Sequence, residues 1–227
     1  MTTTNEAERR RRLRGLYAIT PETDDIARLL VLVRAALDGG ARLVQFRAKS
    51  LPPRERARQA QALLGLCRER GVPLIVNDDV ELAISLGADG VHLGRDDGDP
   101  REVRSRLKDA IIGVSCYDDP ARAVAAAAAG ADYVGIGSVF ASPTKPQAAR
   151  SGLAAIAEAR RLASLPVAAI GGITAANAAL AVAAGADMLA VISALFDAPD
   201  TTAAALALSH PFETESDPHV RTQPAAL

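Results

Sequence analysis

The strongest constraint on the fold is an alternation that runs along most of the chain. Short apolar, β-branched segments alternate with longer segments that are rich in Ala, Leu and Arg. Eight apolar runs can be counted: GLYAIT, RLVQFRAK, VPLIVND, GVHLG, IIGVSC, YVGIGSVF, LPVAAIGG and MLAVIS. Continuous apolar runs separated by helical patterns are typical of parallel strands that helices cover on both faces. The alternation therefore predicts an α/β protein built from eight strand–helix units.

The segments between the runs predict helices at 25–38, 53–70, 80–86, 100–107, 119–129, 153–163, 175–184 and 202–209. A Gly-Ala phrase precedes four of the runs, at Gly40, Gly87, Gly130 and Gly185. Glycine is favoured just after a helix because it adopts the left-handed conformation there. Repetition of this phrase without a break in composition favours a single (β/α)8 TIM barrel over two domains. An open doubly wound sheet shares the local pattern and is the alternative.

Composition narrows the class of protein. Hydrophobic residues make up 49% of the 227, and the formal net charge of -1 provides no basic footprint for nucleic acid or a membrane surface. We expect small-molecule ligands, no nucleic-acid or membrane partner, and an oligomeric state that the sequence leaves open, a homo-oligomer included. No apolar stretch spans a bilayer, the N-terminus lacks an apolar signal segment, and two distant cysteines fit a reducing compartment, so a cytoplasmic protein is expected.

The same patterns predict the domain organisation. Residues 1–14 are expected to be a flexible basic leader, solvated or forming a short helix, 15–210 the (β/α)8 barrel, and 211–227 a disordered polar tail. In such a barrel, function lies at the carboxyl ends of the strands and in the loops that follow them. Polar residues and glycines follow nearly every run: Gln45, Arg47, Lys49, Asn77, Asp78, Asp96, Asp97, Ser115, Ser142, Thr144, Lys145, Gly171, Gly172 and Ser193.

The segment QFRAK concentrates charge at the end of the second run. It spaces Gln45, Arg47 and Lys49 two residues apart, so they share a face if the segment is extended. A strand buried under helices tolerates such a face only if anionic partners are available. Those partners could be carboxylates of the protein, as structural ion pairs, or a bound anion.

Two acidic doublets follow neighbouring runs, Asp78-Asp79 and Asp96-Asp97. An Asp between a strand and a helix is often only the N-cap of that helix. Asp79 and Asp96 are expected to cap helices or to face solvent. Asp78 and Asp97 share their edge of the barrel with cationic side chains, so they are the candidates for a hard cation such as Mg²⁺ with phosphate oxygens.

Later loops carry groups suited to anions. FASPTKP offers two hydroxyl groups and an ammonium, whereas AIGGIT and AVIS end the runs whose loops often form the phosphate site of these barrels. A plain tight turn is the alternative for the glycine pair. His92 lies within its run and favours a core role, and Cys116 favours a small apolar strand end over a nucleophile.

Taken in order, LYAITP, QFRAK, LIVNDD, GVHLGRDD, GVSCY, GIGSVFASPTKP, AIGGI and AVIS resemble the motifs of the thiamine-phosphate synthase family from about Leu16 to Phe196. That family joins a hydroxymethylpyrimidine diphosphate to a thiazole phosphate and releases pyrophosphate, on a Mg²⁺-dependent TIM barrel. The resemblance implies that Asp78 and Asp97 hold Mg²⁺. It implies pyrimidine diphosphate binding by Gln45, Phe46, Arg47, Ala48, Lys49, Asn77, Ser115 and Lys145. It implies thiazole phosphate binding by Ser142, Pro143, Thr144, Gly172, Val191, Ile192 and Ser193.

The resemblance also implies a mechanism, in which the C–O bond breaks early and the thiazole nitrogen traps a pyrimidine-methyl cation. Arg47, Lys49, Lys145 and Ser115 are then the expected catalytic residues, with the three cations stabilising departing pyrophosphate. The chain departs from the usual family pattern at Ala48, Tyr117 and Ser138. Two other functions compete with this one, a thiazole tautomerase and a non-catalytic phosphate-binding barrel. An isomerase would have little use for the two aspartates and the cations together.

Overall fold

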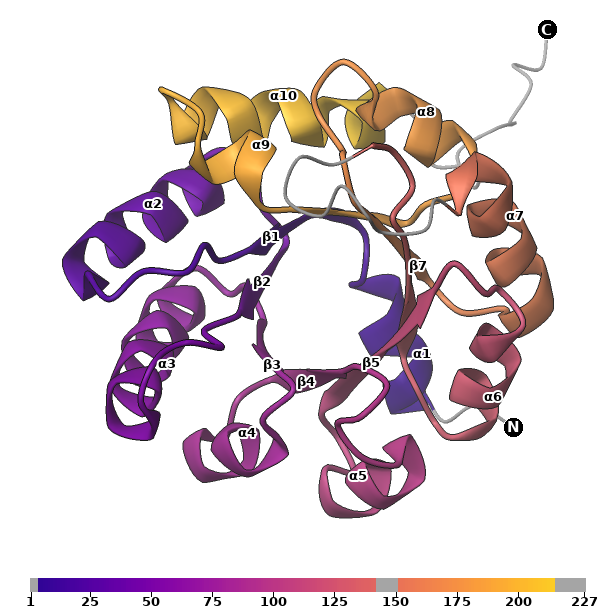
Figure 1. The fold of residues 1–227 in the computed structure, drawn as a ribbon, viewed down its shortest axis with the longest axis horizontal. Helices are drawn as coiled ribbons and strands as arrows, with labels where there is room; N and C mark the ends of the chain where they lie inside the picture. The colour runs from indigo at the N-terminus through magenta and orange to yellow at the C-terminus, as the bar shows by residue number, and fades with distance from the viewer. Residues whose placement is uncertain (1–3, 142–150, 215–227) are drawn as a thin grey trace, which may run out of the picture.

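The computed structural model describes residues 4–141 and 151–214 and shows a closed barrel of parallel strands (Figure 1). The strands are β1 (Gly15–Ile19), β2 (Leu43–Phe46), β3 (Leu74–Asn77), β4 (Gly90–Leu93), β5 (Ile111–Tyr117), β6 (Tyr133–Ile136), β7 (Val167–Ile170) and β8 (Met188–Val191). Each strand pairs with its neighbours in the sequence, and β1 pairs with β8 to close the ring. The predicted (β/α)8 TIM barrel is confirmed, and the open-sheet alternative is wrong.

Helices surround the ring of strands (Figure 1). They are α2 (Ile26–Asp38), α3 (Pro53–Glu69), α4 (Val80–Leu86), α5 (Pro100–Arg106), α6 (Arg122–Ala128), α7 (Gly152–Ala163), α8 (Ala178–Ala183), α9 (Ser193–Phe196) and α10 (Thr201–Thr214). Asp25, Asp79 and Asp99 cap α2, α4 and α5 by accepting backbone N–H groups. The short helix α9 was not predicted, because a single turn carries no helical period.

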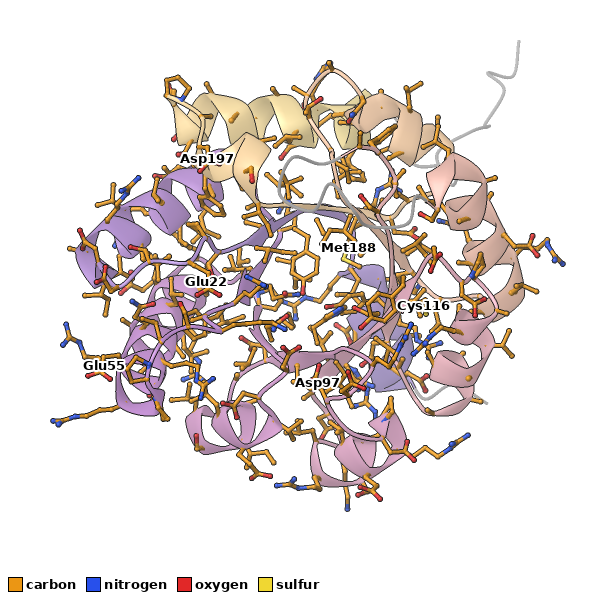
Figure 2. All side chains as sticks on the ribbon, in the orientation of Figure 1. Glu22, Glu55, Asp97, Cys116, Met188 and Asp197 are labelled. Carbon is orange, nitrogen blue, oxygen red and sulfur yellow. The ribbon has the colours of Figure 1, made fainter. Side chains whose placement is uncertain are left out.

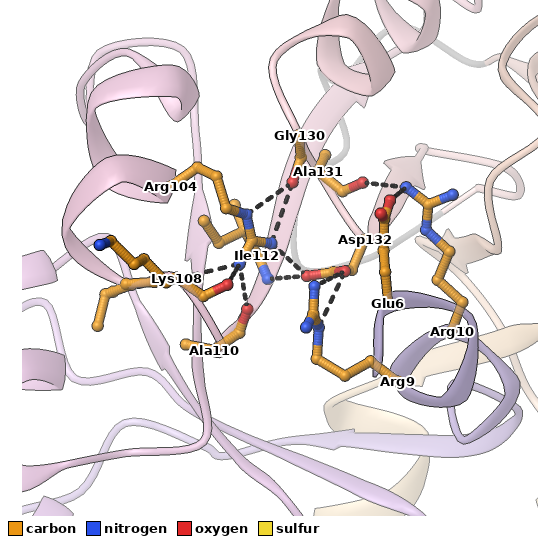
Figure 3. Close-up of polar contacts among 11 residues, drawn as sticks. Glu6, Arg9, Arg10, Arg104, Lys108, Ala110, Ile112, Gly130, Ala131 and Asp132 are labelled. Carbon is orange, nitrogen blue, oxygen red and sulfur yellow. Dashed lines mark hydrogen bonds and ion pairs between the residues drawn. The ribbon is translucent and has the colours of Figure 1, made fainter. Parts of the chain in front are cut away.

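The N-terminal segment forms a helix, α1 (Thr4–Arg11), that lies across one opening of the barrel (Figure 1). Arg9 donates to Asp132 Oδ1 through Nε and Nη2, at 3.2 and 3.1 Å. Asp132 Oδ2 accepts from Arg104 Nη2 at 2.5 Å and from the Ile112 N–H at 2.9 Å (Figure 3). Residues 4–11 of the expected flexible leader therefore form an anchored helix. The anchor is a buried carboxylate far along the chain.

The C-terminal helix also departs from the expected boundaries. α10 continues to Thr214, so it includes residues 211–214 of the tail that was expected to be disordered. Phe212 in this segment packs against the main hydrophobic core, which gives the helix a reason to continue past Pro211. Within the residues described, no helix is both long and apolar enough to cross a bilayer.

The core has two layers, one inside the barrel and one between the strands and the helices. The inner layer contains Tyr17, Ile75, Tyr133 and Met188, and Leu13 from the segment after α1 packs against it. The outer layer is built mainly from Ala, Leu, Val and Ile. Filling the barrel with side chains leaves its two ends as the places where polar groups can meet a ligand.

Candidate functional site

Charged side chains from the loops after β2, β3 and β4 meet at the carboxyl ends of these strands. Lys49 Nζ lies 2.8 Å from Asp78 Oδ2. The carboxyl groups of Asp78 and Asp97 lie close enough for each to shift the pKa of the other, and Figure 2 labels Asp97 at this mouth of the barrel. The structure thus brings together the two aspartates and one of the cations that the sequence predicted to share a site.

The two carboxyl groups respond to this proximity in opposite ways. Burial opposes the charged form of Asp78, but the hydrogen bond and charge of Lys49 outweigh it and hold the pKa of Asp78 below its usual range. For Asp97, burial and the neighbouring Asp78 carboxylate both raise the pKa. Two carboxylates in contact repel one another, and a hard cation between them would allow both to be ionised.

Backbone geometry directs both aspartates. Asp78 has a φ of 64°, in the left-handed region that Asp tolerates better than most residues, and its N–H donates to the His92 carbonyl at 2.9 Å. Asp97 Oδ2 accepts from the Gly94 N–H at 2.8 Å. A Cβ at Gly94 would lie 2.6 Å from that oxygen, so glycine is required for this approach. Tyr117 steadies the same loop, because its hydroxyl accepts from the Arg95 N–H at 3.0 Å.

The other member of each doublet has a different role, as predicted. Asp79 is the N-cap of α4, where its carboxylate accepts from the Leu82 N–H at 2.9 Å. Asp79 Oδ2 also lies 3.6 Å from Arg56 Nε. Asp96 is exposed to solvent. The predicted capping and exposure of these two residues are confirmed.

Glu22, which was not predicted, organises the loop after β2. Its carboxylate accepts from the Lys49 N–H at 2.7 Å and the Ser50 N–H at 3.2 Å, and it pairs with Arg47 Nη1 at 3.2 Å. Burial alone would raise the pKa of Glu22, but these bonds, the Ser50 hydroxyl and the Arg47 charge together lower it. Sequence inspection missed Glu22 because its partners are backbone N–H groups of a distant loop.

The predicted common face of QFRAK holds only in part. β2 ends at Phe46, so Gln45 points into the barrel, whereas Arg47 and Lys49 lie in the loop beyond it. Arg47 pairs with Glu22 and Lys49 with Asp78, so the ion pairs expected under the structural alternative are present. The Lys49 side chain is nevertheless 57% exposed and accessible to an anion.

A chain of polar side chains crosses the barrel interior from β2 to β5. Gln45 Nε2 donates to the Tyr17 hydroxyl at 2.7 Å, and the Tyr17 and Tyr133 hydroxyls lie 2.7 Å apart. Tyr133 lies 2.9 Å from His92 Nδ1, and His92 Nε2 lies 2.9 Å from Ser115 Oγ. Sequence inspection missed both tyrosines. Their signal is a large polar aromatic residue within an otherwise apolar run of a small barrel.

Burial sets the ionisation of the groups around this chain. Burial lowers the pKa of His92 to about 4, against the opposing charge of Asp78, so the imidazole is neutral near pH 7. Burial raises the pKa of Tyr17 and Tyr133, so both keep their hydroxyl hydrogens. Burial also raises the pKa of Cys116 to about 12, which agrees with a small apolar residue and not a nucleophile.

The glycines after β7 have a structural explanation. Gly171 and Gly172 have φ values of 99° and 65°, and a Cβ on either would lie 2.2 Å from an atom of the loop after β6. The next strand ends in the buried Val191, and Ser193 opens α9. Both the tight turn and a phosphate site are compatible with this arrangement. Ser142, Pro143, Thr144 and Lys145 lie outside the described residues.

A cavity of about 240 Å³ adjoins the charged loops. It is lined by Phe46, Ala48, Lys49, Arg56, Val76, Asn77, Asp78, Asp79 and Leu82. Across residues 4–141 and 151–214, no three Asp, Glu, His or Cys side chains converge as a complete metal site. A cation held by Asp78 and Asp97 would therefore need further oxygen ligands, such as those of a bound phosphate group.

Comparisons with known proteins agree on one family. The family model described as thiamine monophosphate synthase matches residues 16–195. The thiamine-phosphate synthase of Thiobacillus denitrificans is 57% identical over 204 residues, covering 89% of this chain and 97% of that protein. The corresponding Chromobacterium violaceum protein is 58% identical over 199 residues, covering 87% and 96%. The solved structure of thiamine phosphate pyrophosphorylase from Pyrococcus furiosus superposes with a TM-score of 0.80 at 37% identity, covering 90% and 98%. The chain therefore belongs to the thiamine-phosphate synthase family.

Proposed function

We propose that the loops after β2, β3 and β4 bind the pyrimidine diphosphate together with Mg²⁺, and that the loops after β7 and β8 bind the thiazole phosphate. Thiamine-phosphate synthases couple these two substrates in thiamine biosynthesis. The observation that carries the proposal is the contact of Asp78 with both Lys49 and Asp97 at the carboxyl ends of the strands. Carboxylates beside an exposed ammonium suit a magnesium diphosphate, which presents both signs of charge.

Asp78 and Asp97 are the residues that would hold Mg²⁺. Their proximity and their opposite pKa shifts are what we expect of two carboxylates that act together as oxygen ligands of a cation. Bound Mg²⁺ would supply positive charge next to the diphosphate oxygens as that group departs.

Lys49 and Arg47 would stabilise the same leaving group. Each is paired with a carboxylate, Asp78 or Glu22, so substrate binding would exchange carboxylate oxygens for phosphate oxygens. When the C–O bond breaks, its electron pair stays on pyrophosphate, and the C–N bond forms from the thiazole nitrogen lone pair. The protein must therefore stabilise negative charge and position two substrates, without a proton transfer to either. Lys145 is expected to add a third cation.

The remaining predicted residues divide between the two substrates. Gln45, Phe46, Ala48, Asn77 and Ser115 lie on or just after β2, β3 and β5, and are assigned to the pyrimidine diphosphate. Gly172, Val191, Ile192 and Ser193, with Ser142, Pro143 and Thr144, are assigned to the thiazole phosphate. Small-molecule substrates suffice for this reaction. Two free, buried cysteines support a reducing, cytoplasmic location.

The experiment is turnover of both substrates by the purified full chain, with Mg²⁺ and with the metal chelated. Metal-dependent formation of thiamine phosphate and pyrophosphate is expected. Lys49→Gln is expected to lower kcat/KM for the pyrimidine diphosphate about 100-fold, whereas Lys108→Gln, a lysine next to the N-terminal end of β5, is expected to change nothing. Turnover that is indifferent to metal, or equal in the two lysine variants, would overturn the proposal.

A further inference from the structure

Two buried tyrosines and the half-buried His92 link two expected substrate-binding residues across the barrel interior. Tyr17, Tyr133 and His92 connect Gln45 on β2 to Ser115 on β5 through hydrogen bonds of 2.7 to 2.9 Å. We infer that these three are positioning residues, which fix the direction of every hydrogen bond in the chain and so determine what Gln45 and Ser115 present to the substrate.

The donor in each of these hydrogen bonds follows from the hydrogens that each side chain carries. Gln45 Nε2 can only donate, so the Tyr17 oxygen accepts its hydrogen. Tyr17 is buried, and a buried hydroxyl hydrogen needs an acceptor, so we assign its donation to the neighbouring Tyr133 oxygen. The Tyr133 hydroxyl then donates onward to His92 Nδ1, which must be unprotonated. A neutral imidazole with a bare Nδ1 carries its hydrogen on Nε2.

The tautomer of His92 determines the direction of its hydrogen bond to Ser115, one of the two expected substrate-binding residues. His92 Nε2–H donates to Ser115 Oγ, so the serine oxygen acts as acceptor towards the protein. Its own hydrogen is left to donate to the substrate. At the opposite end, Gln45 uses Nε2 inside the barrel, which leaves its carbonyl oxygen as an acceptor. The two ends therefore offer one acceptor and one donor.

That combination suits one chemical class of ligand. An aminopyrimidine carries amino N–H groups, which need an acceptor, and ring nitrogens, which need a donor. This step rests on the proposed function, in which Gln45 and Ser115 meet the pyrimidine diphosphate. If every hydrogen bond ran the opposite way, Gln45 would present its NH₂ group and Ser115 its lone pairs, and the preference would be inverted.

Close packing inside the barrel fixes the positions of these hydrogen-bonded side chains. Tyr17 and Tyr133 are almost fully buried, and their rings meet edge to face with centroids 5.9 Å apart. The His92 and Tyr133 rings are stacked at 5.5 Å. On β5, a Cβ at Gly113 would lie 2.1 Å from the Tyr133 ring, so the strand leaves room for that ring alone. Tight packing makes each hydroxyl a fixed link between two partners.

The first test measures the tautomer of His92 in the ligand-free full chain. Nitrogen-15 NMR on histidine-labelled protein reports which ring nitrogen carries hydrogen. The chain has three histidines, and a His210→Gln, His219→Gln variant leaves His92 as the single signal. A neutral ring with hydrogen on Nε2 is expected. A ring protonated on Nδ1, alone or together with Nε2, would overturn the inference.

The second test interrupts the hydrogen-bonded series of side chains at its central residue, Tyr133. Tyr133→Phe keeps the ring but removes the oxygen that joins Tyr17 to His92. We expect the His92 signal to change to a mixture of tautomers, and kcat/KM for the pyrimidine diphosphate to fall about tenfold, with KM for the thiazole phosphate unchanged. Tyr117→Phe is the matched control for the spectrum, because its hydroxyl binds the Arg95 N–H and not this chain. An unchanged tautomer in Tyr133→Phe would contradict the inference.

Failure of this inference can be told apart from failure of the proposed function. The tautomer is measured without substrate, so the measurement tests the positioning role even if the protein forms no thiamine phosphate. If Tyr133→Phe does not fold, Tyr17→Phe interrupts the same chain one link earlier and carries the same expectations. Normal turnover with hydrogen on Nδ1 would leave the function intact and reject the positioning role.

Discussion

Asp78 combines a backbone conformation and a set of neighbours that ordinary loop residues avoid. Its φ of 64° is costly for most side chains, and its carboxylate contacts a second carboxylate, Asp97, as well as Lys49. Strain and like-charge contact in one residue are typical of a site whose geometry serves a ligand. Asp79, the next residue, has the ordinary task of capping a helix.

Glu22 predicts a pH dependence of stability. Its carboxylate is hydrogen-bonded in the folded chain and its pKa is lowered, so its stabilising effect is present above the unfolded pKa of about 4.3. That effect is lost as the pH falls through the folded pKa. Glu22→Gln should therefore destabilise the chain by about 1 kcal/mol at pH 7, and the difference from wild type should shrink towards pH 3. Urea unfolding at both pH values measures this, and a constant difference would contradict the assignment.

At the residue scale, the sequence predicted the groups whose chemistry is local. An Asp between a strand and a helix indicates a cap or a ligand, and the structure separates Asp79 from Asp78 in the expected sense. Glu22 and Tyr133 could not be predicted in the same way. Their roles depend on partners brought close by barrel closure, and no local spacing records such contacts.

Strand β5 depends on a glycine that makes room for an aromatic ring. Gly113→Ala would place a Cβ 2.1 Å from the Tyr133 ring, so we expect it to destabilise the chain by about 2 kcal/mol or more. Gly65 lies within α3 and has no neighbouring atom within 4 Å of a Cβ. Gly65→Ala should therefore stabilise by about 0.5 to 1 kcal/mol. Thermal unfolding of the two variants checks the contrast, and a shift of the same sign in both would contradict it.

Helix α1 depends on one buried carboxylate at the amino ends of the strands. The Asp132 side chain is 1% exposed and pairs with Arg9 and Arg104 (Figure 3). Asp132→Asn leaves two guanidinium groups without their charge partner, and should cost about 3 kcal/mol in the free energy of unfolding.

The control for this prediction is an ion pair on the surface. Glu158 and Arg161 are paired on α7 with both side chains well exposed, so Glu158→Gln should leave the unfolding midpoint unchanged. Equal effects of the Asp132 and Glu158 substitutions would show that α1 is not anchored in this way.

At the element scale, periodicity predicted the strands and the helices between them to within a few residues. It failed for α1, a highly polar segment whose helix is stabilised by contacts with Asp132 and Ala131 far along the chain. It failed also for α9, a single turn. Both exceptions are elements that tertiary contacts stabilise and that their own sequences do not specify.

For the whole molecule, closure of the barrel brings loops that are distant in the sequence together at one end. All eight strands run the same way, so every strand presents its following loop at the same end of the barrel. Asp78 and Asp97, from different loops, meet there, while Asp132 and α1 lie at the other end. One end thus carries the groups that we propose to bind the substrates, and the other carries stabilising contacts.

In the proposed reaction, Asp78 and not its neighbour Asp79 serves the metal-assisted step. The direct test is kcat for thiamine phosphate formation at saturating Mg²⁺ in Asp78→Asn and Asp79→Asn. Asparagine tolerates the left-handed conformation at 78 and caps a helix well at 79, so both variants should fold. We predict a loss of at least about 100-fold for Asp78→Asn and less than about threefold for Asp79→Asn. Equal losses, or full activity of Asp78→Asn, would rule out this role for Asp78.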